Sequence, residues 1–421
     1  MGFINVAELK PEMTAAQDVS NPDGRFLLAK GTTLSEKHLR TLRMWGVIEV
    51  DVEGISAADA ANEAIAHIDP ENVTMAEKLV AKRFQFTDRE YPPLDALFHI
   101  CAKRKAELIA KGLDVTPPPI PAMSKTPAKF NSASKKEPVK IESFKTIAQN
   151  INLPSLPMIY GQINEITKKP SSSAKDIGRI ISNDTSLSAR LLRLVNSTFY
   201  GFPSTIDTLS RAVTIVGVKQ LSTLALGISI VKVFDDIPSE LIDMRSFWEH
   251  SIACGIAARI IATFKKVANS ERLFVAGLLH DIGRLLLYSH KPRLAQKALL
   301  AAQDGSHLVY EAEQEILGFD HTHLGGMLLN QWNLPLSLEN DIRFHHAPTE
   351  AKDPKEAAIV HLADIIVTAL ELGSSGERHV PPLFTEAWEH LGLSPNIISL
   401  AINQIDFQLA ETKQHFAIKD E

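Results

Sequence analysis

The sequence predicts a mainly α protein, in which a long all-helical domain follows a small mixed α/β module. Three observations lead to this prediction. From Ile141 onward, apolar residues recur at helical spacing without convincing strand alternation. Residues 3–54 instead combine short extended runs with turn signals, and proline and lysine dominate residues 114–138. We therefore expect four parts: a small α/β module at 1–56, a helical spacer at 57–113, a linker at 114–138 and an all-α domain at 139–421.

The first two parts are defined by short elements. Asn21-Pro22-Asp23-Gly24 is a strong turn signal, and Ser35 is a candidate N-cap for the helix that follows it. The module should contain strands at Phe3–Val6, Arg25–Leu28 and Ile48–Val52 and a helix at Thr33–Arg43. The spacer up to Lys111 reads as helical, with breaks at Pro70, Pro92 and Pro93. No cluster of residues in either part suggests chemistry.

The segment TPPPIPAMSKTPAKFNSASKKEP separates these parts from the large domain. It holds six prolines and four lysines and few apolar groups. Such a segment cannot bury enough surface to offset its ordering entropy, so we expect an extended or disordered linker. Beyond it, the spacing predicts helices at Asp176–Ile181, Ser188–Leu194, Ser210–Val216, Lys219–Val233, Ser246–Phe264, Glu271–His290, Lys291–Gln303, Leu308–Leu317, His321–Trp332, Ser337–His346 and Lys355–Leu372.

Composition bounds the class of protein. The chain has 421 residues, 45% apolar and 22% charged, with a net charge of −6, which argues against a dedicated nucleic-acid binder. The N-terminus lacks a signal-peptide pattern, and the longest apolar stretch, Leu221–Phe234, is short and interrupted by Lys232. Two cysteines, Cys101 and Cys254, cannot form a disulfide framework and read as packing residues. We expect a cytoplasmic protein without a membrane partner.

The stretch ERLFVAGLLHDIGRLLLYSH, residues 271–290, is the centre of the large domain. Its apolar residues follow helical spacing, yet His280 and Asp281 stand where two more packing residues are expected. Buried unpaired polar groups cost a few kcal/mol, and a metal ion would satisfy both side chains together. An isolated His-Asp pair is common, so the remaining histidines decide its meaning.

Histidines are concentrated around this stretch. Nine of the fifteen lie between residues 250 and 361, where an even spread would place about four. Several occupy inward faces: His250 shares a stripe with Phe247 and Cys254, and His321 precedes a small-residue pair. A carboxylate on the apolar face of the last long helix also needs a partner. The candidate ligands are His250, His280, Asp281, His321, His345, His346 and Asp364.

This ligand set exceeds the needs of one ion. A bridging aspartate among imidazoles suits two divalent transition metals, Fe, Mn or Zn, rather than Mg or Ca. Two such ions about 3.5–4 Å apart could share a hydroxide for attack on a phosphoryl group. Asp281 would then be catalytic, and Arg284, one turn beyond His280, could hold a phosphate oxygen. Satisfaction of the histidines by backbone carbonyls is the alternative.

Several motifs resemble the HDOD domain, the HD-related output domain of bacterial signalling proteins. They are LPSLP at 153–157, IISNDTSLSARLLRLVNSTFYG at 180–201 with its Asn196-Ser197 pair, GLLHDIGRLLL, and FDHTHLGGMLLNQWNLP. The sequence departs from the family pattern at Thr185, where proline is usual, and at Val216, where leucine is usual. The resemblance implies an all-helical fold and a role as a signalling output or adaptor with a signalling protein partner.

A second resemblance is to catalytic HD-type phosphohydrolases, especially the HD-GYP cyclic di-GMP phosphodiesterases. It implies that the seven candidate ligands match that superfamily's metal ligands, which many HDOD domains lack. Arg284 stands where lysine is usual, Ser246 replaces a glutamate, and HHAPTEAKDP takes the place of the Gly-Tyr-Pro substrate loop. Residues 4–53 also resemble a short module that precedes HD-type domains in some signalling proteins.

Two functions follow as competing hypotheses. The first is a signalling output or adaptor module with a structural or sensory two-metal site. The second is a di-metal phosphodiesterase or phosphohydrolase that acts on a nucleotide or a cyclic dinucleotide. A nucleic-acid-binding regulator is a third, and the negative net charge argues against it. The sequence leaves the substrate, the upstream signal and the oligomeric state open.

Overall fold

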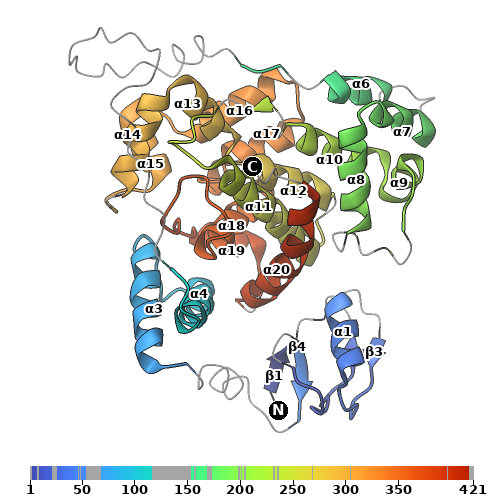
Figure 1. Cartoon of the computed structure of the whole chain (residues 1–421), viewed down its shortest axis with the longest axis vertical. Coiled ribbons are helices and arrows are strands. Elements are labelled where there is room, and N and C mark those ends of the chain that lie inside the picture. Colours follow the sequence, from blue (N-terminus) through green and yellow to red (C-terminus); the bar gives the residue numbers. More distant parts are fainter. Residues whose placement is uncertain are drawn as a thin grey trace. The chain divides into compact units, whose positions relative to one another are not determined.

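The computed structural model is dominated by helices, with four short strands near the N-terminus (Figure 1). This confirms the predicted mainly α class with a small α/β module. The structure describes residues 2–6, 9–20, 26–45, 47, 49–53, 68–115, 153–155, 158–167, 173–197, 200, 202, 205–230, 233–234, 237–267, 269–303, 305–395 and 397–416. The expected turn at 21–24 and nearly all of the expected linker at 114–138 lie outside these residues.

The chain packs into two compact units. Unit 1 comprises residues 1–82, 89–116 and 394–407, and unit 2 comprises residues 83–88, 117–393 and 408–421. The expected boundaries at 57, 114 and 139 stay predictions, because they fall at or beside residues that the structure does not describe.

The N-terminal module of unit 1 has two antiparallel strand pairs and one helix. Strand β1 (Gly2–Asn5) pairs with β4 (Glu49–Val52), and β2 (Val19–Ser20) pairs with β3 (Phe26–Leu28). Helix α1 (Glu36–Met44) begins three residues after the expected start at Thr33, directly after the expected N-cap Ser35, whose side chain accepts a hydrogen bond from the His38 backbone N–H. The core of this module is one apolar cluster, which includes Ile4, Leu39, Leu42, Val50 and Val52.

Three further helices belong to unit 1 among the residues that the structure describes, two of them only in part. These are α3 (Pro70–Arg83), α4 (Pro92–Ala110) and the first half of α20 (Ile397–Phe416). The three prolines expected as breaks lie in the first turns of α3 and α4, where a missing N–H costs no hydrogen bond. Arg104 on α4 pairs with Asp406 on α20, with Nη1 3.2 Å from Oδ1.

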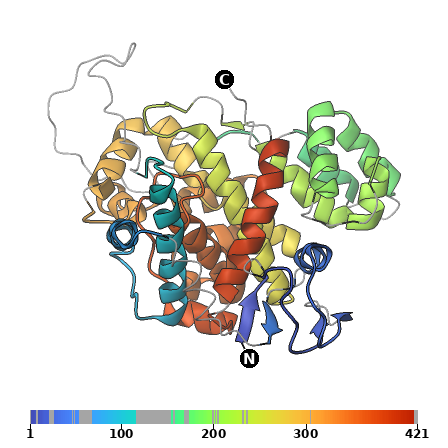
Figure 2. The ribbon, with the colours of Figure 1, turned by 60° about the horizontal axis from the view of Figure 1, so that its bottom comes forward.

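Unit 2 begins with five helices that lie together in both ribbon views (Figures 1 and 2). They are α6 (Met158–Thr167), α7 (Ala174–Ser182), α8 (Thr185–Asn196), α9 (Leu209–Val216) and α10 (Val218–Ile230). Asn196 fixes the connection from α8 to α9: its Oδ1 accepts from the Ile206 N–H at 2.6 Å, and its Nδ2 donates to the Ile206 carbonyl at 2.8 Å. The Asn196 motif therefore has a structural role in the described residues.

The next part of unit 2 is built on the long buried helix α11. This helix packs against α12 and α18, and α12 also packs against α10. Their bounds are α11 Met244–Phe264, α12 Ser270–Leu279, α13 Ile282–His290, α14 Pro292–Gln303, α15 Val309–Leu317, α16 His321–Gln331, α17 Leu336–Arg343, η2 Pro348–Glu350, α18 Pro354–Ala369 and α19 Thr385–Leu391.

No single helix among the described residues has the length and apolarity needed to cross a membrane. The pair α9 and α10, bent by 119° between them, passes that test only when taken together, on length and composition.

Two expected helices are wrong in detail. The stretch Glu271–His290 is two helices, which break at His280–Asp281, rather than one. Successive residues of a continuous α-helix point about 100° apart, whereas the break lets His280 and Asp281 face each other, with Nε2 3.3 Å from Oδ2. The expected helix Ser337–His346 ends early, at Arg343, and the histidine pair lies in the turn that follows.

Gly283 permits the close approach of α13 and α16. A Cβ at this position would lie 1.9 Å from the His321 carbonyl oxygen and 2.7 Å from the Gly325 backbone nitrogen. Neither backbone atom can move without shifting a helix. The first turns of α13 and α16, which begin beside Asp281 and with His321, therefore depend on this glycine.

We expect Gly283→Ala to destabilise the protein by about 1–3 kcal/mol or more, because overpacking of a fixed backbone contact costs that much. Gly161→Ala on α6 is the matched control, since a Cβ there meets nothing within 4 Å. It should leave stability unchanged or raise it by about 0.5–1 kcal/mol through helix propensity. Urea unfolding followed by circular dichroism measures both, and equal midpoints would contradict the close-approach argument.

Candidate metal centre

The structure brings all seven sequence-predicted ligands together at the middle of unit 2. α11 contributes His250, the α12–α13 break contributes His280 and Asp281, and α16 begins with His321. The turn after α17 contributes His345 and His346, and α18 contributes Asp364. Every one of them is buried, with no side chain more than 8% exposed.

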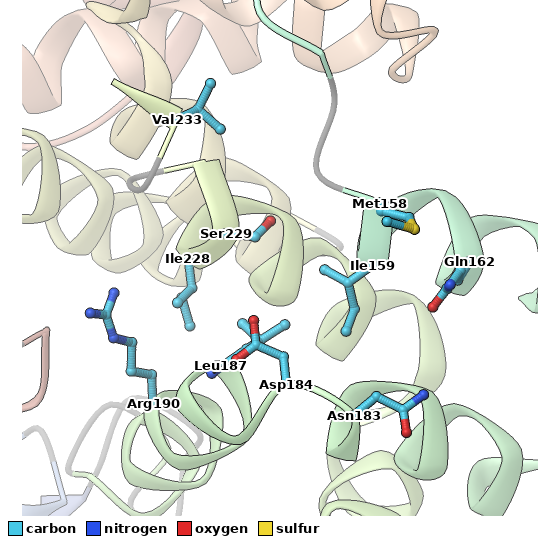
Figure 3. Close-up of a pocket in the computed structure, with 10 residues that line it drawn as sticks. All are labelled: Met158, Ile159, Gln162, Asn183, Asp184, Leu187, Arg190, Ile228, Ser229 and Val233. Atoms are coloured by element: carbon cyan, nitrogen blue, oxygen red, sulfur yellow. Dashed lines mark hydrogen bonds between the residues drawn. The ribbon is translucent and has the colours of Figure 1, made fainter. Parts of the chain in front are cut away.

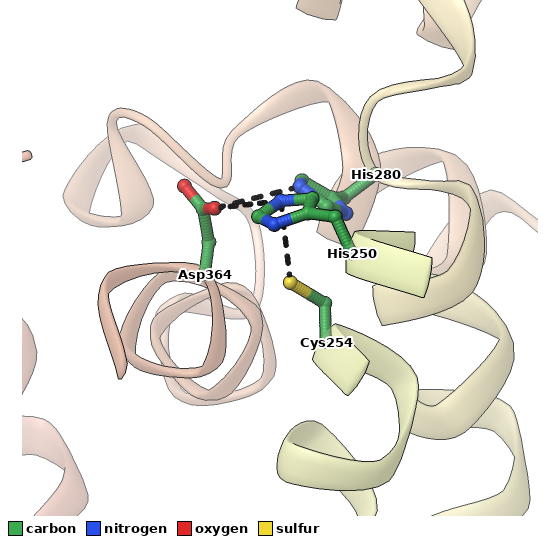
Figure 4. A group of neighbouring side chains, drawn as sticks. All are labelled: His250, Cys254, His280 and Asp364. Carbon is green, nitrogen blue, oxygen red and sulfur yellow. Dashed lines mark hydrogen bonds and ion pairs between the residues drawn. The ribbon is translucent and has the colours of Figure 1, made fainter. Parts of the chain in front are cut away.

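The ligand atoms fall into two groups. The first is His250, His280 and Asp364, joined by Cys254; the second is Asp281, His321, His345 and His346. Within each group the candidate ligand atoms all lie within 4.8 Å of one another. Figure 4 shows the first group, with the Asp364 carboxylate facing both imidazoles and Cys254 below His250.

Asp281 lies between the two groups and offers one oxygen to each. Its Oδ1 is 2.8 Å from His321 Nε2 and 3.9 Å from His345 Nε2. Its Oδ2 is 3.3 Å from His280 Nε2 and 4.0 Å from His250 Nε2. Asp281 is the N-cap residue of α13, but its carboxylate makes no capping hydrogen bond. Both oxygens therefore remain directed at imidazoles, as a bridging carboxylate requires.

Backbone carbonyls fix the orientation of two further imidazoles. His280 Nδ1 lies 2.7 Å from the Gly277 carbonyl oxygen, and His345 Nδ1 lies 2.7 Å from the Ile342 carbonyl oxygen. Because a carbonyl only accepts, each Nδ1 must carry a proton and donate, so Nε2 is the nitrogen that can bind a metal once its own proton is absent. Both Nε2 atoms face the centre, and metal-binding histidines are typically held in this way.

A carboxylate performs the same task for His321. Its Nδ1 lies 2.6 Å from Glu313 Oε2, which also accepts from the His321 backbone N–H at 2.9 Å. Arg284 Nε approaches the same Nδ1 at 3.3 Å, but the shorter carboxylate contact decides that Nδ1 donates. Glu313, on α15, is 1% exposed. It completes a carboxylate–histidine pair that raises the basicity of the ligand.

Unpartnered polar atoms show where an ion would fit. His280 Nε2, His321 Nε2, His345 Nε2, Asp281 Oδ1 and both ring nitrogens of His346 are buried without a hydrogen bond. The contact of 2.8 Å between His321 and Asp281 therefore lacks hydrogen-bond geometry. Orphaned buried groups are rare because each costs about 1–3 kcal/mol. Lone pairs that converge in this way fit transition-metal ions, which would draw nitrogen and carboxylate ligands from both groups.

The charges of the centre are strongly coupled. Burial alone would raise the pKa of Asp281, but the Arg284 guanidinium and the His280 imidazole hold it well below its usual range. Burial would likewise lower the pKa of His280, but the Asp281 carboxylate raises it to about 10. Burial lowers the pKa of His345 to about 3, so this imidazole is neutral. Binding of a metal must displace the protons of the charged imidazoles.

Arg284, the predicted phosphate contact, is 1% exposed and surrounded by protein groups. Its Nη1 donates to the Ser375 Oγ at 2.8 Å and to the Ser375 carbonyl at 3.2 Å. Its Nε lies 3.4 Å from Asp281 Oδ1 and 3.9 Å from Glu313 Oε1. In this arrangement Arg284 balances the two buried carboxylates, and a phosphate contact would require it to leave them.

A separate cavity of about 410 Å³ lies among α6, α8 and α10 (Figure 3). Its lining includes the apolar Ile159, Leu187 and Ile228, with Asp184 and Arg190 at one side, and none of the candidate metal ligands. Arg190 forms no ion pair with any residue that the structure describes. The residues that line this cavity are thus separate from the metal centre.

Sequence reasoning missed three residues of the centre. Glu313 lies eight residues before His321, on the preceding helix, and Ser375 lies 91 residues after Arg284, which it contacts. Nothing in the local pattern marks either residue. Cys254 follows His250 by four residues on the same helical face. That spacing was visible, but the small size of cysteine favoured a packing role.

The fold and the site define an all-α domain of the HD type with a buried His/Asp metal-binding pattern. Residues 153–348 match the family model of the HDOD domain, so the chain carries an HDOD domain there. An uncharacterized protein of Treponema pallidum (strain Nichols) is 28% identical over 216 residues, which are 49% of this chain and 41% of that protein. This chain therefore matches about two-fifths of that relative's length.

Two solved structures share the fold. A presumed phosphohydrolase from Shewanella amazonensis SB2B is 25% identical, with a TM-score of 0.52, and the match covers 64% of this chain and 97% of that one. An HDOD domain protein of unknown function from Geobacter sulfurreducens is 22% identical, with a TM-score of 0.53, over 65% of this chain and 95% of that one.

We expect Glu313→Gln to weaken metal binding by roughly 10–100-fold, because loss of the carboxylate lowers the basicity and the fixed orientation of His321. Glu315→Gln on the same helix is the matched control, since its side chain is 71% exposed and lies outside the centre. Competition titration with a chromophoric chelator measures both affinities. Equal affinities for the two variants would show that Glu313 does not support a ligand.

Proposed function

We propose that this protein is a signalling output module in which a two-metal centre holds the HDOD domain in the conformation that its signalling partner recognises. The observation that carries the proposal is the closure of the centre. All seven candidate ligands are at most 8% exposed. Structural metal sites are closed by protein ligands, whereas catalytic sites keep a position open for water or substrate.

The position of Arg284 supports the same function. A phosphohydrolase needs a cation that is free to contact the substrate phosphate. The guanidinium of Arg284 is instead buried and bonded to Ser375, between Asp281 and Glu313. These contacts suit a residue that offsets the negative charge of the two buried carboxylates. They do not suit a residue that binds the phosphate of a substrate.

Occupancy of the centre would act on the packing of the domain. The two ions would join five segments that are distant in sequence: α11, the α12–α13 break, the first turn of α16, the turn after α17, and α18. A ligand that binds only the folded state stabilises it by about 2.7 kcal/mol at a hundredfold excess over its dissociation constant. A change in metal occupancy or identity would therefore change the stability of the surface offered to a partner.

The second candidate function is a di-metal phosphohydrolase or phosphodiesterase that acts on a nucleotide. Asp281 directs one oxygen at each ligand group, as a two-metal hydrolase would require. The Shewanella amazonensis protein that bears the name of a phosphohydrolase matches this chain at 25% identity. His346 and Asp364 are the most exposed candidate ligands, at 8% and 6%. A hydrolase function requires the centre to open further than this, so that substrate can enter.

We expect protein purified without oxygen to contain close to two transition-metal ions per chain, and Asp281→Ala to lose at least one of them, because this carboxylate faces both groups. His307→Ala, whose side chain is 41% exposed, is the control and should keep the ions. Inductively coupled plasma mass spectrometry measures the content. A metal content below about half an equivalent per chain, unchanged by Asp281→Ala, would contradict the metal centre and both functions that depend on it.

Activity decides between the two functions. With the ions bound, we expect no turnover of cyclic dinucleotides or of bis-p-nitrophenyl phosphate, because the closed centre leaves no place for a phosphodiester. Metal-dependent hydrolysis that disappears in Asp281→Ala and persists in His307→Ala would overturn the output function and establish the enzyme.

Removal of the ions should lower the thermal unfolding midpoint by roughly 5–10 °C, since the lost binding free energy is a few kcal/mol. Differential scanning calorimetry with and without a chelator measures the shift. Asp281→Ala should show a clearly smaller shift on chelation, because it has fewer ions to lose. A chelator effect of equal size in that variant would assign the stabilisation to metal bound elsewhere.

A further inference from the structure

We propose that Cys254 is a metal ligand, and that its thiolate completes a His₂-Cys-Asp site for a thiophilic ion such as Zn²⁺ in the first ligand group. This inference rests on the proposed two-metal centre and assigns one of its two positions. The site consists of His250, Cys254, His280 and Asp364 (Figure 4). Cys254 is not among the ligands implied by the resemblance to HD-type phosphohydrolases.

The backbone places the thiol beside the imidazole. Cys254 follows His250 by four residues in α11, and residues at this spacing are neighbours on one helix face. Cys254 is 0% exposed, and its Sγ lies 3.5 Å from His250 Nε2. Asp364 reaches the same nitrogen from α18, with Oδ1 at 3.3 Å.

Three of the six distances between the four candidate ligand atoms match the edges of a tetrahedron, and all six are at most 4.8 Å. With zinc bond lengths of about 2.0–2.1 Å to nitrogen, 2.0–2.2 Å to oxygen and 2.3 Å to sulfur, the N···O edge is about 3.3–3.5 Å and the N···S edge about 3.6 Å. The structure gives 3.3 Å and 3.6 Å from Asp364 Oδ1 to His250 Nε2 and His280 Nε2. It gives 3.5 Å for Cys254 Sγ to His250 Nε2.

Hydrogen bonds alone do not account for this group. His250 Nε2 has a thiol on one side and an ionised carboxylate on the other, and a single ring nitrogen can donate to only one of them. His280 presents a second Nε2 to Asp364 at 3.6 Å, and this buried nitrogen has no hydrogen bond. An ion at the centre of the four atoms satisfies all of them together, including the orphaned His280 nitrogen.

The sulfur distinguishes the two positions chemically. The second group holds only imidazole and carboxylate ligands, which suit Fe, Mn or Zn, whereas a thiolate favours zinc and other thiophilic ions. With four protein ligands the first position is coordinatively full, as in structural zinc sites. Asp281 then remains available to the second group through Oδ1. The centre would therefore combine a closed structural ion with a second ion of different preference.

Cobalt substitution tests this assignment without a measurement of activity. A tetrahedral Co²⁺ ion gives visible bands with any ligands, and a thiolate ligand adds an intense near-ultraviolet charge-transfer band. The chain contains only two cysteines, Cys101 and Cys254. The full-length protein is stripped of metal, freed of thiol reductant and titrated with Co²⁺ as wild type, Cys101→Ser and Cys254→Ser. Cys101 lies in α4 and is the matched control.

We expect the charge-transfer band in the wild type and in Cys101→Ser, and its complete loss in Cys254→Ser. Cobalt that gives visible bands without the charge-transfer band in Cys101→Ser would overturn the role of Cys254 while leaving the two-metal centre in place. A protein that takes up no cobalt would overturn both. If Cys254→Ser does not fold by circular dichroism, the spectrum of Cys101→Ser, with Cys254 as its sole cysteine, still decides the result.

Discussion

The architecture of unit 2 depends on the burial of two aspartates among apolar helices. Asp281 is 2% exposed and Asp364 is 6% exposed, and an isolated carboxylate in such surroundings would be prohibitively costly. Five imidazoles and one guanidinium gather around them, drawn from elements that span residues 250–364. In the proposed centre, metal ions would take the place of the protons that charge the surrounding imidazoles.

The helices are shaped by this requirement. The break at His280–Asp281 interrupts the helix, but it lets the two side chains face each other at the metal centre. The contact between Gly283 and the His321 carbonyl brings α16 close enough for His321 Nε2 to reach Asp281. The early end of α17 places His345 in a turn, where the Ile342 carbonyl and His361 hold it through its ring and its backbone oxygen. Each departure from regular helix serves the position of a ligand.

The mainly α class and nearly all helices of unit 2 were predictable, because amphipathic spacing extends over complete helices. All seven candidate ligands could be named, because inward histidines conflict with the apolar faces that carry them. The break at residues 280–281 was not predictable: no proline marks it, and it arises from the contact with α16. Glu313 also escaped prediction: it lies eight residues before His321 on the preceding helix, and the sequence alone does not give the turn between α15 and α16 that brings the two side chains together.

The closure of the first ligand group favours a structural metal site over a catalytic one. A centre made for hydrolysis would gain from weakly held water and an open face, yet Cys254, His250, His280 and Asp364 enclose one position completely. Such closure favours retention of an ion over exchange with substrate. Through α12, whose end carries His280, the enclosed centre is in direct packing contact with α10, which also lines the cavity among α6, α8 and α10. A metal ion that holds α12 in place would therefore also act on one wall of that cavity.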